Sequence, residues 1–182
     1  MSLHFNRSQI RSGMILHVRS WTRFGKLIRY VLGSWGNHDG LMWQDKDGTW
    51  YVLESVSPWA TRTPLRAYED AMDAGWTFCR VYWPIGAMED QGAAACDWWL
   101  RYVDGTFYDW LGIGRLAIKA VFGDWIQRAA GWEWAHWCTE GVADAWRLGG
   151  RADAWRKINP TPLTTEHRVG ETLVEMQGVL TP

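Results

Sequence analysis

Cysteine is scarce in this sequence, and long hydrophobic runs are missing from it. The 182 residues include three cysteines and no Cys-x-x-Cys pair, which disfavours both a disulfide framework and a zinc ribbon. No stretch of about 18 apolar residues is present, so we expect no transmembrane helix. The first residues, MSLHFNRSQIRSGM, lack the apolar centre of a signal peptide. We therefore expect a protein that is synthesised and folded in the reducing cytoplasm.

An excess of charge of either sign is also missing. The formal net charge is -1, so the sequence lacks the positive footprint of a nucleic-acid-binding protein. With 47% hydrophobic and 21% charged residues, the composition is that of a globular protein and not of a disordered one. Residues 1–182 contain no internal repeat and no convincing linker. We expect a single domain over 1–182, and its oligomeric state stays open.

Tryptophan, by contrast, is abundant. The chain has 16 of them, and some are adjacent, as in Trp98-Trp99. Clustered indoles form stacking platforms for sugars or flat ligands, whereas scattered indoles replace leucine and phenylalanine in a core. Because these tryptophans are spread along the whole chain, we interpret them as core residues.

Hydrophobic periodicity predicts an alternation of strands and helices. Alternating apolar residues favour strands at 11–20 and 76–84, and two such runs around Asp-Lys-Asp-Gly favour a hairpin within 37–56. A helical repeat favours helices in these places: 21–34, 63–75, 88–103, 111–131 and the run after Cys138. The tail at 159–182 begins as a Pro/Thr-rich loop and can end in a short helix or strand. This order predicts an α+β fold, with an antiparallel sheet packed against helices.

The helix expected at 21–34 is amphipathic and basic. Its apolar residues share one face, and Arg23, Lys26 and Arg29 lie away from that face. Such a helix either covers the core of its own protein or lies on a membrane or an acidic partner. We favour the first interpretation, because surface helices of this kind are common in globular proteins.

The stretch AHWCTEGVADAWRL, residues 135–148, places Cys138 at the start of a helix, because apolar residues recur at helical spacing behind it. A helix start presents free N–H groups and the positive end of the helix dipole, which favour the thiolate form of a cysteine. The backbone N–H of Cys138 is then free to help hold an oxyanion. We expect Cys138 to be the reactive thiol, and Cys79 and Cys96 to be small buried hydrophobes.

A catalytic cysteine also needs an imidazole within reach and a polar group that orients the imidazole. The chain has five histidines. His17 falls on the polar side of its strand, and His136 points the same way as Cys138 only if the segment is extended. His38 opens the predicted hairpin, and Glu54 lies on the second strand of that hairpin. Whether these two side chains meet depends on the turn between them.

A two-residue turn puts His38 and Glu54 on opposite faces of the sheet. A three-residue loop over 46–48 instead makes them diagonal neighbours on the same face, with Gly40 opposite Glu54. Gly48 suits the left-handed position of such a bulged loop. We predict the three-residue loop, with the imidazole directed toward the candidate nucleophile.

The order of several short motifs resembles a known family. GSWGNHDGLMW, then WYVLESVSPWATRTPL, GTFYDW and HWCTEGVADAW, is similar to the circularly permuted papain-like cysteine hydrolases of the NlpC superfamily, in particular the YiiX-like group. The likeness covers about residues 10–165. It implies a permuted papain-like fold in which Cys138 is the nucleophile, His38 the base and Glu54 the acid that orients it. It implies no metal and no cofactor.

Three features depart from the family pattern. Asp39 stands where the family usually has a β-branched residue, and Gly13-Met14 replaces the usual Gly-Asp. Trp137 and Gly141 replace a tyrosine and a leucine around the cysteine. None of these changes removes a reacting group, but they alter the expected substrate pocket.

The residues and the resemblance together predict a thiol-dependent peptidase or amidase, with bacterial cell-wall peptides as the first candidate substrates. Asp39 and Arg62 at a cleft edge suit the free amine and carboxylate of a peptide. Trp59, Tyr108 and Trp137 complete the expected substrate-binding residues. Without a secretion signal, such an enzyme would reach a cell wall through lysis, a phage or a secretion apparatus.

Two other functions stay open at this point. A lipid acyl hydrolase or acyltransferase of the same fold would need a wide apolar channel, which a helix at 111–126 has the residues to line. A non-catalytic, tryptophan-rich binding or structural module would keep the fold and leave Cys138 unreactive. Thiol reactivity separates this last function from the other two.

Overall fold

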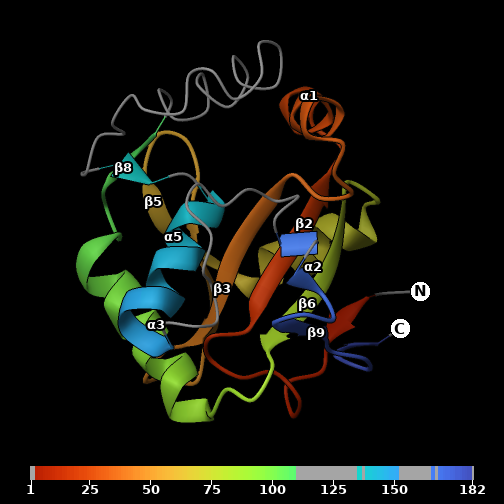
Figure 1. Cartoon of the computed structure of the whole chain (residues 1–182). Helices are drawn as coiled ribbons and strands as arrows, with labels where there is room; N and C mark the ends of the chain where they lie inside the picture. The colour runs from red at the N-terminus through yellow and green to blue at the C-terminus, as the bar shows by residue number, and fades with distance from the viewer. Residues whose placement is uncertain (1–2, 110–134, 137, 152–164, 167, 182) are drawn as a thin grey trace.

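The computed structural model describes residues 3–109, 135–136, 138–151, 165–166 and 168–181 (Figure 1). Its central sheet has six strands in the order β5-β4-β3-β2-β6-β9, and every neighbouring pair is antiparallel. These strands are β2 (Ile15–Ser20), β3 (His38–Gln44), β4 (Trp50–Ser55), β5 (Ala60–Pro64), β6 (Thr77–Pro84) and β9 (Leu173–Glu175).

Two small strand pairs lie outside this sheet. They are the antiparallel pair of β1 (His4–Phe5) with β10 (Leu180–Thr181) and the parallel pair of β7 (Phe107–Tyr108) with β8 (Ala135–His136). The predicted strands at 11–20 and 76–84 and the predicted hairpin are confirmed as β2, β6 and β3–β4. Strand β5 was not predicted, and the helix predicted at 111–131 lies outside the described residues.

Helices pack against both faces of the sheet (Figure 1). The elements are α2 (Leu65–Asp73), α3 (Glu89–Tyr102), α5 (Cys138–Asp144) and the π-helical η2 (Ala145–Gly150), which continues α5 directly. α3 packs against η2, α5 contacts β3 and β4, and α2 contacts β4 and β6. α2 and α5 lie on opposite faces of the sheet, because consecutive residues of β4 point to opposite faces. Glu54 binds Tyr68 of α2, whereas Ser55 lies so close to Gly141 of α5 that an added Cβ there would be 3.3 Å from its hydroxyl oxygen. The predicted α+β fold, with an antiparallel sheet packed against helices, is confirmed.

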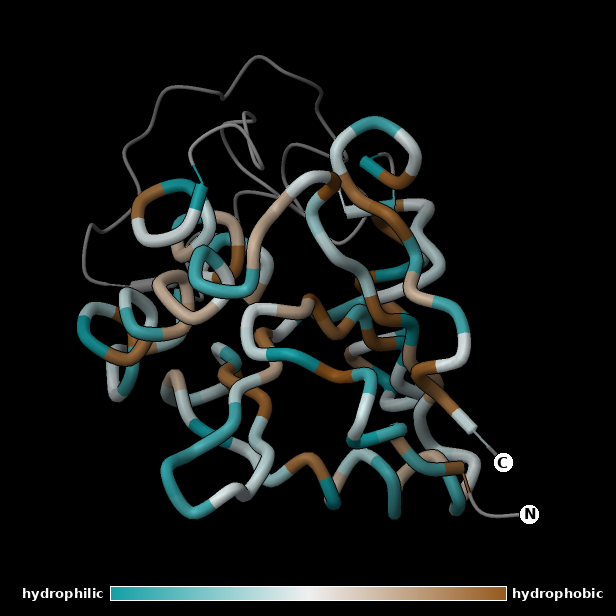
Figure 2. The backbone as a smooth tube through the Cα atoms, turned by 90° about the horizontal axis from the view of Figure 1, so that it is seen from below, coloured by the Kyte–Doolittle hydropathy of each residue, from teal (hydrophilic) through white to brown (hydrophobic). Residues whose placement is uncertain are grey.

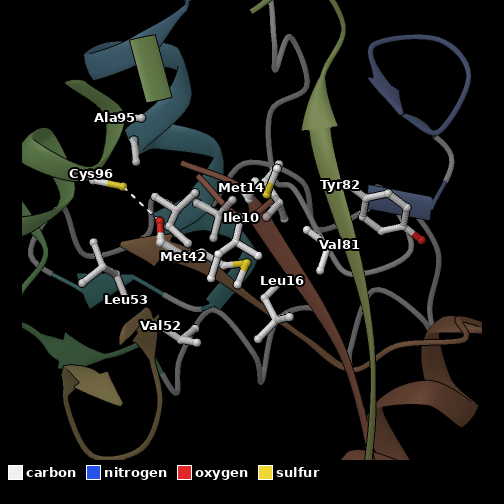
Figure 3. Packing of buried hydrophobic residues seen from close by; sticks show 14 of the residues in the cluster. Ile10, Met14, Leu16, Met42, Val52, Leu53, Val81, Tyr82, Ala95 and Cys96 are labelled. Carbon is white, nitrogen blue, oxygen red and sulfur yellow. Dashed lines mark hydrogen bonds between the residues drawn. The ribbon is translucent and has the colours of Figure 1, made fainter. Parts of the chain in front are cut away.

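The hydrophobic core joins the inner strands to α3 and α5. Figure 3 shows buried side chains of these strands: Met42 and Leu53 lie on the side of Cys96 of α3, and Leu16 and Val52 lie farther from it. The Cys96 thiol donates a hydrogen bond to the Met42 carbonyl at 3.5 Å. Cys79 and Cys96 are buried as predicted. In Figure 2 hydrophobic (brown) and hydrophilic (teal) segments alternate along the backbone.

Tryptophans occupy both the core and the surface. Trp99 and Trp146 are fully buried, and the indole of Trp146 donates to the Gly13 carbonyl at 3.1 Å. Trp59 and Trp76 are exposed. The interpretation of the tryptophans as core residues therefore holds for only some of them.

Helix α1 (Arg23–Leu32) forms where a helix was predicted. The Thr22 hydroxyl accepts the Gly25 N–H at 3.0 Å at its start, and Gly33, with φ of 65°, ends it in the left-handed conformation. The expectation that α1 covers the core is wrong, because Gly25 is its only buried residue. A Cβ at Gly25 would come within 2.5 Å of the Ser20 hydroxyl oxygen, so the helix touches the sheet through this glycine.

Candidate active site

The β3–β4 hairpin has the predicted register. Leu41 pairs with Leu53 and Met42 with Val52, which leaves residues 46–48 as a three-residue loop. Gly48 lies in the left-handed region, with φ of 80°. This register puts two polar side chains of the hairpin on one face, as the sequence predicted.

Those two side chains are His38, the first residue of β3, and Glu54, near the end of β4. His38 Nε2 lies 2.5 Å from Glu54 Oε2. Glu54 is 3% exposed, and the His38 side chain is 13% exposed. A buried carboxylate in contact with the ring nitrogen fixes the orientation of the imidazole.

Tyr68 of α2 holds the same carboxylate oxygen. Its hydroxyl donates to Glu54 Oε2 at 2.5 Å. Burial by itself raises the pKa of Glu54, but the interactions with His38, and then with Thr63 and Tyr68, lower it below its ordinary value. Glu54 is therefore ionised at neutral pH. Sequence reasoning missed Tyr68, because nothing in the helical pattern of α2 singles out this tyrosine.

Cys138 is the first residue of α5 and is 6% exposed. It interacts with the imidazole of His38. Burial by itself lowers the pKa of His38, but the charge and hydrogen bond of Cys138, and then those of Glu54, raise it well above its ordinary value. The arrangement therefore favours an imidazolium at neutral pH, placed between the Cys138 side chain and the Glu54 carboxylate.

The other two thiols lie in different surroundings. Burial is the main cause that raises the pKa of Cys79 and of Cys96 far above the value of a free cysteine. Neither of them is paired with a histidine in the described part of the chain. They have the character of inert core cysteines.

A second histidine, His17 of β2, is the cross-strand partner of Asp39, and its position corrects two sequence-based expectations. His17 is fully buried, and not on a solvated polar face, and its Nδ1 lies 2.6 Å from Asp39 Oδ1. The other oxygen of Asp39 accepts hydrogen bonds from Thr139 at 2.5 Å and Thr165 at 3.0 Å. Asp39 is thus buried with both oxygens occupied, and the expectation that it lies at a cleft edge for a substrate amine is wrong.

The same network reaches the C-terminal part of the chain. His17 Nε2 lies 3.2 Å from Glu166 Oε1, which also accepts the Gly36 N–H at 3.0 Å. Burial lowers the pKa of His17, but Asp39 and then Glu166 raise it to about 9. Asp39 follows His38 and Thr139 follows Cys138, so their hydrogen bond ties β3 to α5 beside the two proposed reacting groups.

The remaining predicted substrate residues are placed differently from one another. Tyr108 is buried, and after burial the charge of Cys138 is the next cause that raises its pKa, so it lies near the candidate nucleophile. Trp59 is exposed and contacts Phe107 in a tilted arrangement, with ring centroids 4.4 Å apart. Arg62 forms an ion pair with Asp104. Trp137 lies outside the described residues.

Comparison with known proteins gives likenesses to solved structures but none to a sequence family. No family model matches the sequence, and no curated protein matches it. The crystal structure of the metalloprotein YiiX from Escherichia coli O157:H7 is similar to this chain, with a TM-score of 0.61 and 17% sequence identity. The alignment covers 95% of this chain and 96% of that one. At this identity the likeness shows a shared YiiX-like fold.

The metal in the description of that protein has no evident counterpart among the described residues of this chain. They contain no group of three or more His, Cys, Asp or Glu side chains placed to hold a metal ion. His38 is engaged by Glu54, and His17 by Asp39 and Glu166. Within the same residues, no helix has the length and apolar character needed to cross a bilayer.

Proposed function

We propose that this chain is a permuted papain-like cysteine hydrolase, a single domain over 1–182, that cleaves an amide bond through a thioester intermediate. The observation that carries the proposal is the row formed by Cys138, His38 and Glu54, in which a buried carboxylate orients the imidazole that interacts with a thiol at a helix start. Each member has the chemical character that its role requires.

The proposed reaction begins with the thiolate–imidazolium pair. The sulfur of Cys138 attacks the carbonyl carbon, and the carbonyl oxygen becomes an oxyanion near the backbone N–H of Cys138. His38 gives its proton to the leaving amine, and the C–N bond breaks to leave a thioester. Water then attacks the thioester while His38 takes its proton, and the departing thiolate is regenerated. Glu54, held by Tyr68, keeps the ring in place throughout.

Bacterial cell-wall peptides remain our first candidate substrates. Tyr108 interacts with Cys138, and its N–H donates to the Pro58 carbonyl at 3.0 Å, next to Trp59. The exposed pair of Trp59 and Phe107 would therefore contact substrate groups near the scissile bond. We retain Trp59, Tyr108 and Trp137 as proposed substrate-binding residues. We also retain Arg62. Because it is paired with Asp104, its guanidinium would bind a substrate carboxylate while still in contact with Asp104.

A lipid acyl hydrolase or acyltransferase is the second candidate. The same exposed Trp59–Phe107 pair supports it, because two aromatic rings in contact offer an apolar surface to an acyl chain as well as to an apolar peptide side chain. The chemistry at the sulfur is identical for an ester and an amide. The two candidates differ in the product released.

One experiment tests the proposed reaction and ranks the substrates. The chain would be incubated with muropeptides and with acyl lipids, and mass spectrometry would follow the products and any mass added to Cys138. We expect cleaved peptide from the native chain and no product from Cys138→Ala. Limiting iodoacetamide should alkylate Cys138 before Cys79 and Cys96, and His38→Ala should slow this alkylation. Equal alkylation of all three thiols would instead identify a non-catalytic module, and release of fatty acid alone would favour the lipid candidate.

A further inference from the structure

A row of cations and indoles runs from β6 across β2 to α1. Going along it, the guanidinium of Arg80 lies 4.2 Å from the Trp35 ring centroid, and that of Arg19 lies 5.8 Å from Trp35 and 5.1 Å from Trp21. Trp21 also contacts Arg29 at 5.3 Å and Lys26 at 5.4 Å. We call these six residues the cation–indole row. Each indole has more than one cation within reach of its ring.

The cations of this row have no acidic partner among the described residues. Elsewhere in the chain the structure pairs arginines with carboxylates, as in Arg7 with Glu69 and Arg66 with Asp70. The Nε of Arg19 is buried without any hydrogen-bond partner. Burial, and then the charge of Arg19, lower the pKa of Arg29. Like charges are thus crowded here, and the described residues supply no counter-ion, in a chain whose net charge is only -1.

The outer face of α1 adds exposed apolar groups to this charge. Leu27 is 56% exposed and Tyr30 is 86% exposed, although both belong to an amphipathic helix. Arg23 and Lys26, four residues and one residue before Leu27, are also exposed. Cationic and apolar side chains therefore share one solvent-facing surface of a helix that does not cover the core.

We propose that α1 and the cation–indole row dock on the surface of an anionic lipid bilayer. Leu27 and Tyr30 would enter the boundary between headgroups and acyl chains, and the cations would meet the lipid phosphates. A bound soluble anion would neutralise the cations but leave the apolar side chains in water. The coincidence of both groups on one face favours a lipid surface.

This docking would bring the proposed active site to the bilayer. Arg29 Nη1 donates to Asn37 Oδ1 at 3.1 Å, and Asn37 directly precedes His38. The docking surface and the proposed catalytic histidine are thus joined through two adjacent residues. The docking itself does not rest on the hydrolase activity, because it is measured as binding to vesicles and not as turnover.

Vesicle flotation of the full chain tests the proposal. We expect binding to vesicles of mixed phosphatidylglycerol and phosphatidylcholine, and little binding to phosphatidylcholine alone. Lys26→Glu should weaken the partition at least fivefold, because each cation near such a surface contributes about that factor. The matched charge change Lys46→Glu, in the exposed hairpin loop, should have a much smaller effect. Leu27→Ser should also weaken binding, whereas Ile85→Ser, at another exposed apolar residue, should not.

Hydrogen exchange of the unmodified chain locates the contact without any variant. The amides of Arg23–Leu32 should exchange more slowly when anionic vesicles are added. Equal slowing by inorganic phosphate alone would overturn the proposal in favour of a simple anion site. Tighter binding to polyglutamate than to vesicles would overturn it in favour of an acidic protein partner. Equal losses in Lys26→Glu and Lys46→Glu, or no vesicle binding, would also overturn it.

Discussion

Glu54 accepts two hydrogen bonds on one carboxylate oxygen, from His38 and from Tyr68, and both are made out of contact with bulk water. Hydrogen bonds to a charged group in such surroundings contribute more than neutral ones, and leaving one partner unmatched is costly. The three side chains therefore act as a unit, and removing either donor should weaken the hydrogen bond that the other makes to Glu54.

Tyr68→Phe tests the outer half of this unit. The phenyl ring preserves the packing, but Glu54 loses one donor, so we expect the free energy of unfolding to fall by about 2 kcal/mol. Turnover should fall as well, because the carboxylate is less firmly placed. Urea denaturation and a chromogenic ester substrate measure the two effects. The control is Tyr51→Phe, whose hydroxyl has no hydrogen-bond partner among the residues that the structure describes; a loss of equal size there would contradict the role of Tyr68.

Glu54→Gln tests the inner half through pH. The charge of Glu54 helps to raise the pKa of His38. Activity should be lost as the pH rises through the pKa of the imidazolium, so the basic limb of the native profile should lie well above pH 6.5, the ordinary value. In Glu54→Gln this limb should move to lower pH, and the maximal rate should fall roughly 100-fold. A basic limb that stays in place would remove Glu54 from the mechanism.

At the scale of elements, the β3–β4 hairpin is the device that brings the polar pair to one face. Its register depends on the loop over 46–48, since a shift by one residue would carry every side chain of a strand to the other face. This part of the site was predictable from sequence, because turn length and the position of Gly48 are local properties. The contact between His38 and Glu54 follows from them.

Gly48→Ala tests the loop. Gly48 has φ of 80°, and its nearest neighbour for an added Cβ, an atom of Gln44, is 3.8 Å away, so the cost of alanine is conformational and not a clash. We expect a loss of about 1 kcal/mol in the free energy of unfolding. Gly48→Asn should cost less, because asparagine tolerates the left-handed region. Equal effects of the two substitutions in thermal unfolding would argue against a conformational cause.

Other elements escaped prediction because their determinants are not local. The amphipathic pattern of α1 is the same whether its apolar face meets a core or a bilayer, so the pattern left its partner undecided. The hydrogen bond between Thr139 and Asp39 joins residues 100 positions apart, and that between His17 and Glu166 spans 149 positions. The alternating pattern of β2 put His17 on a polar side. Consecutive residues of β2 are in fact buried, so both faces of this strand are covered, which alternation alone does not register.

At the scale of the whole molecule, His17 is the point where distant parts of the chain are tied together. Its ring contacts Asp39 of β3 and Glu166 near the C-terminus, and Asp39 in turn holds Thr139 of α5. An imidazolium can donate from both ring nitrogens, one to each carboxylate, whereas the neutral ring can donate from only one. The protonation of a single buried group therefore bears on the stability of the assembled fold.

The sign of this effect is fixed by the pKa of His17, which rises from 6.5 in an ordinary environment to about 9 in the fold. The folded state binds this proton more tightly, so the stabilisation is complete below pH 6.5 and is lost as the pH rises to about 9. Its size is on the order of 3 kcal/mol. His38 changes the stability with pH in the same direction. The contribution of His17 is therefore isolated by urea denaturation as the difference in free energy of unfolding between the native chain and His17→Gln at each pH. We expect this difference to shrink across that interval, and Asp39→Asn to shift the interval to lower pH. A difference that stays constant from pH 6.5 to 9 would mean that His17 is neutral in the folded chain and that its two carboxylates are held by other donors.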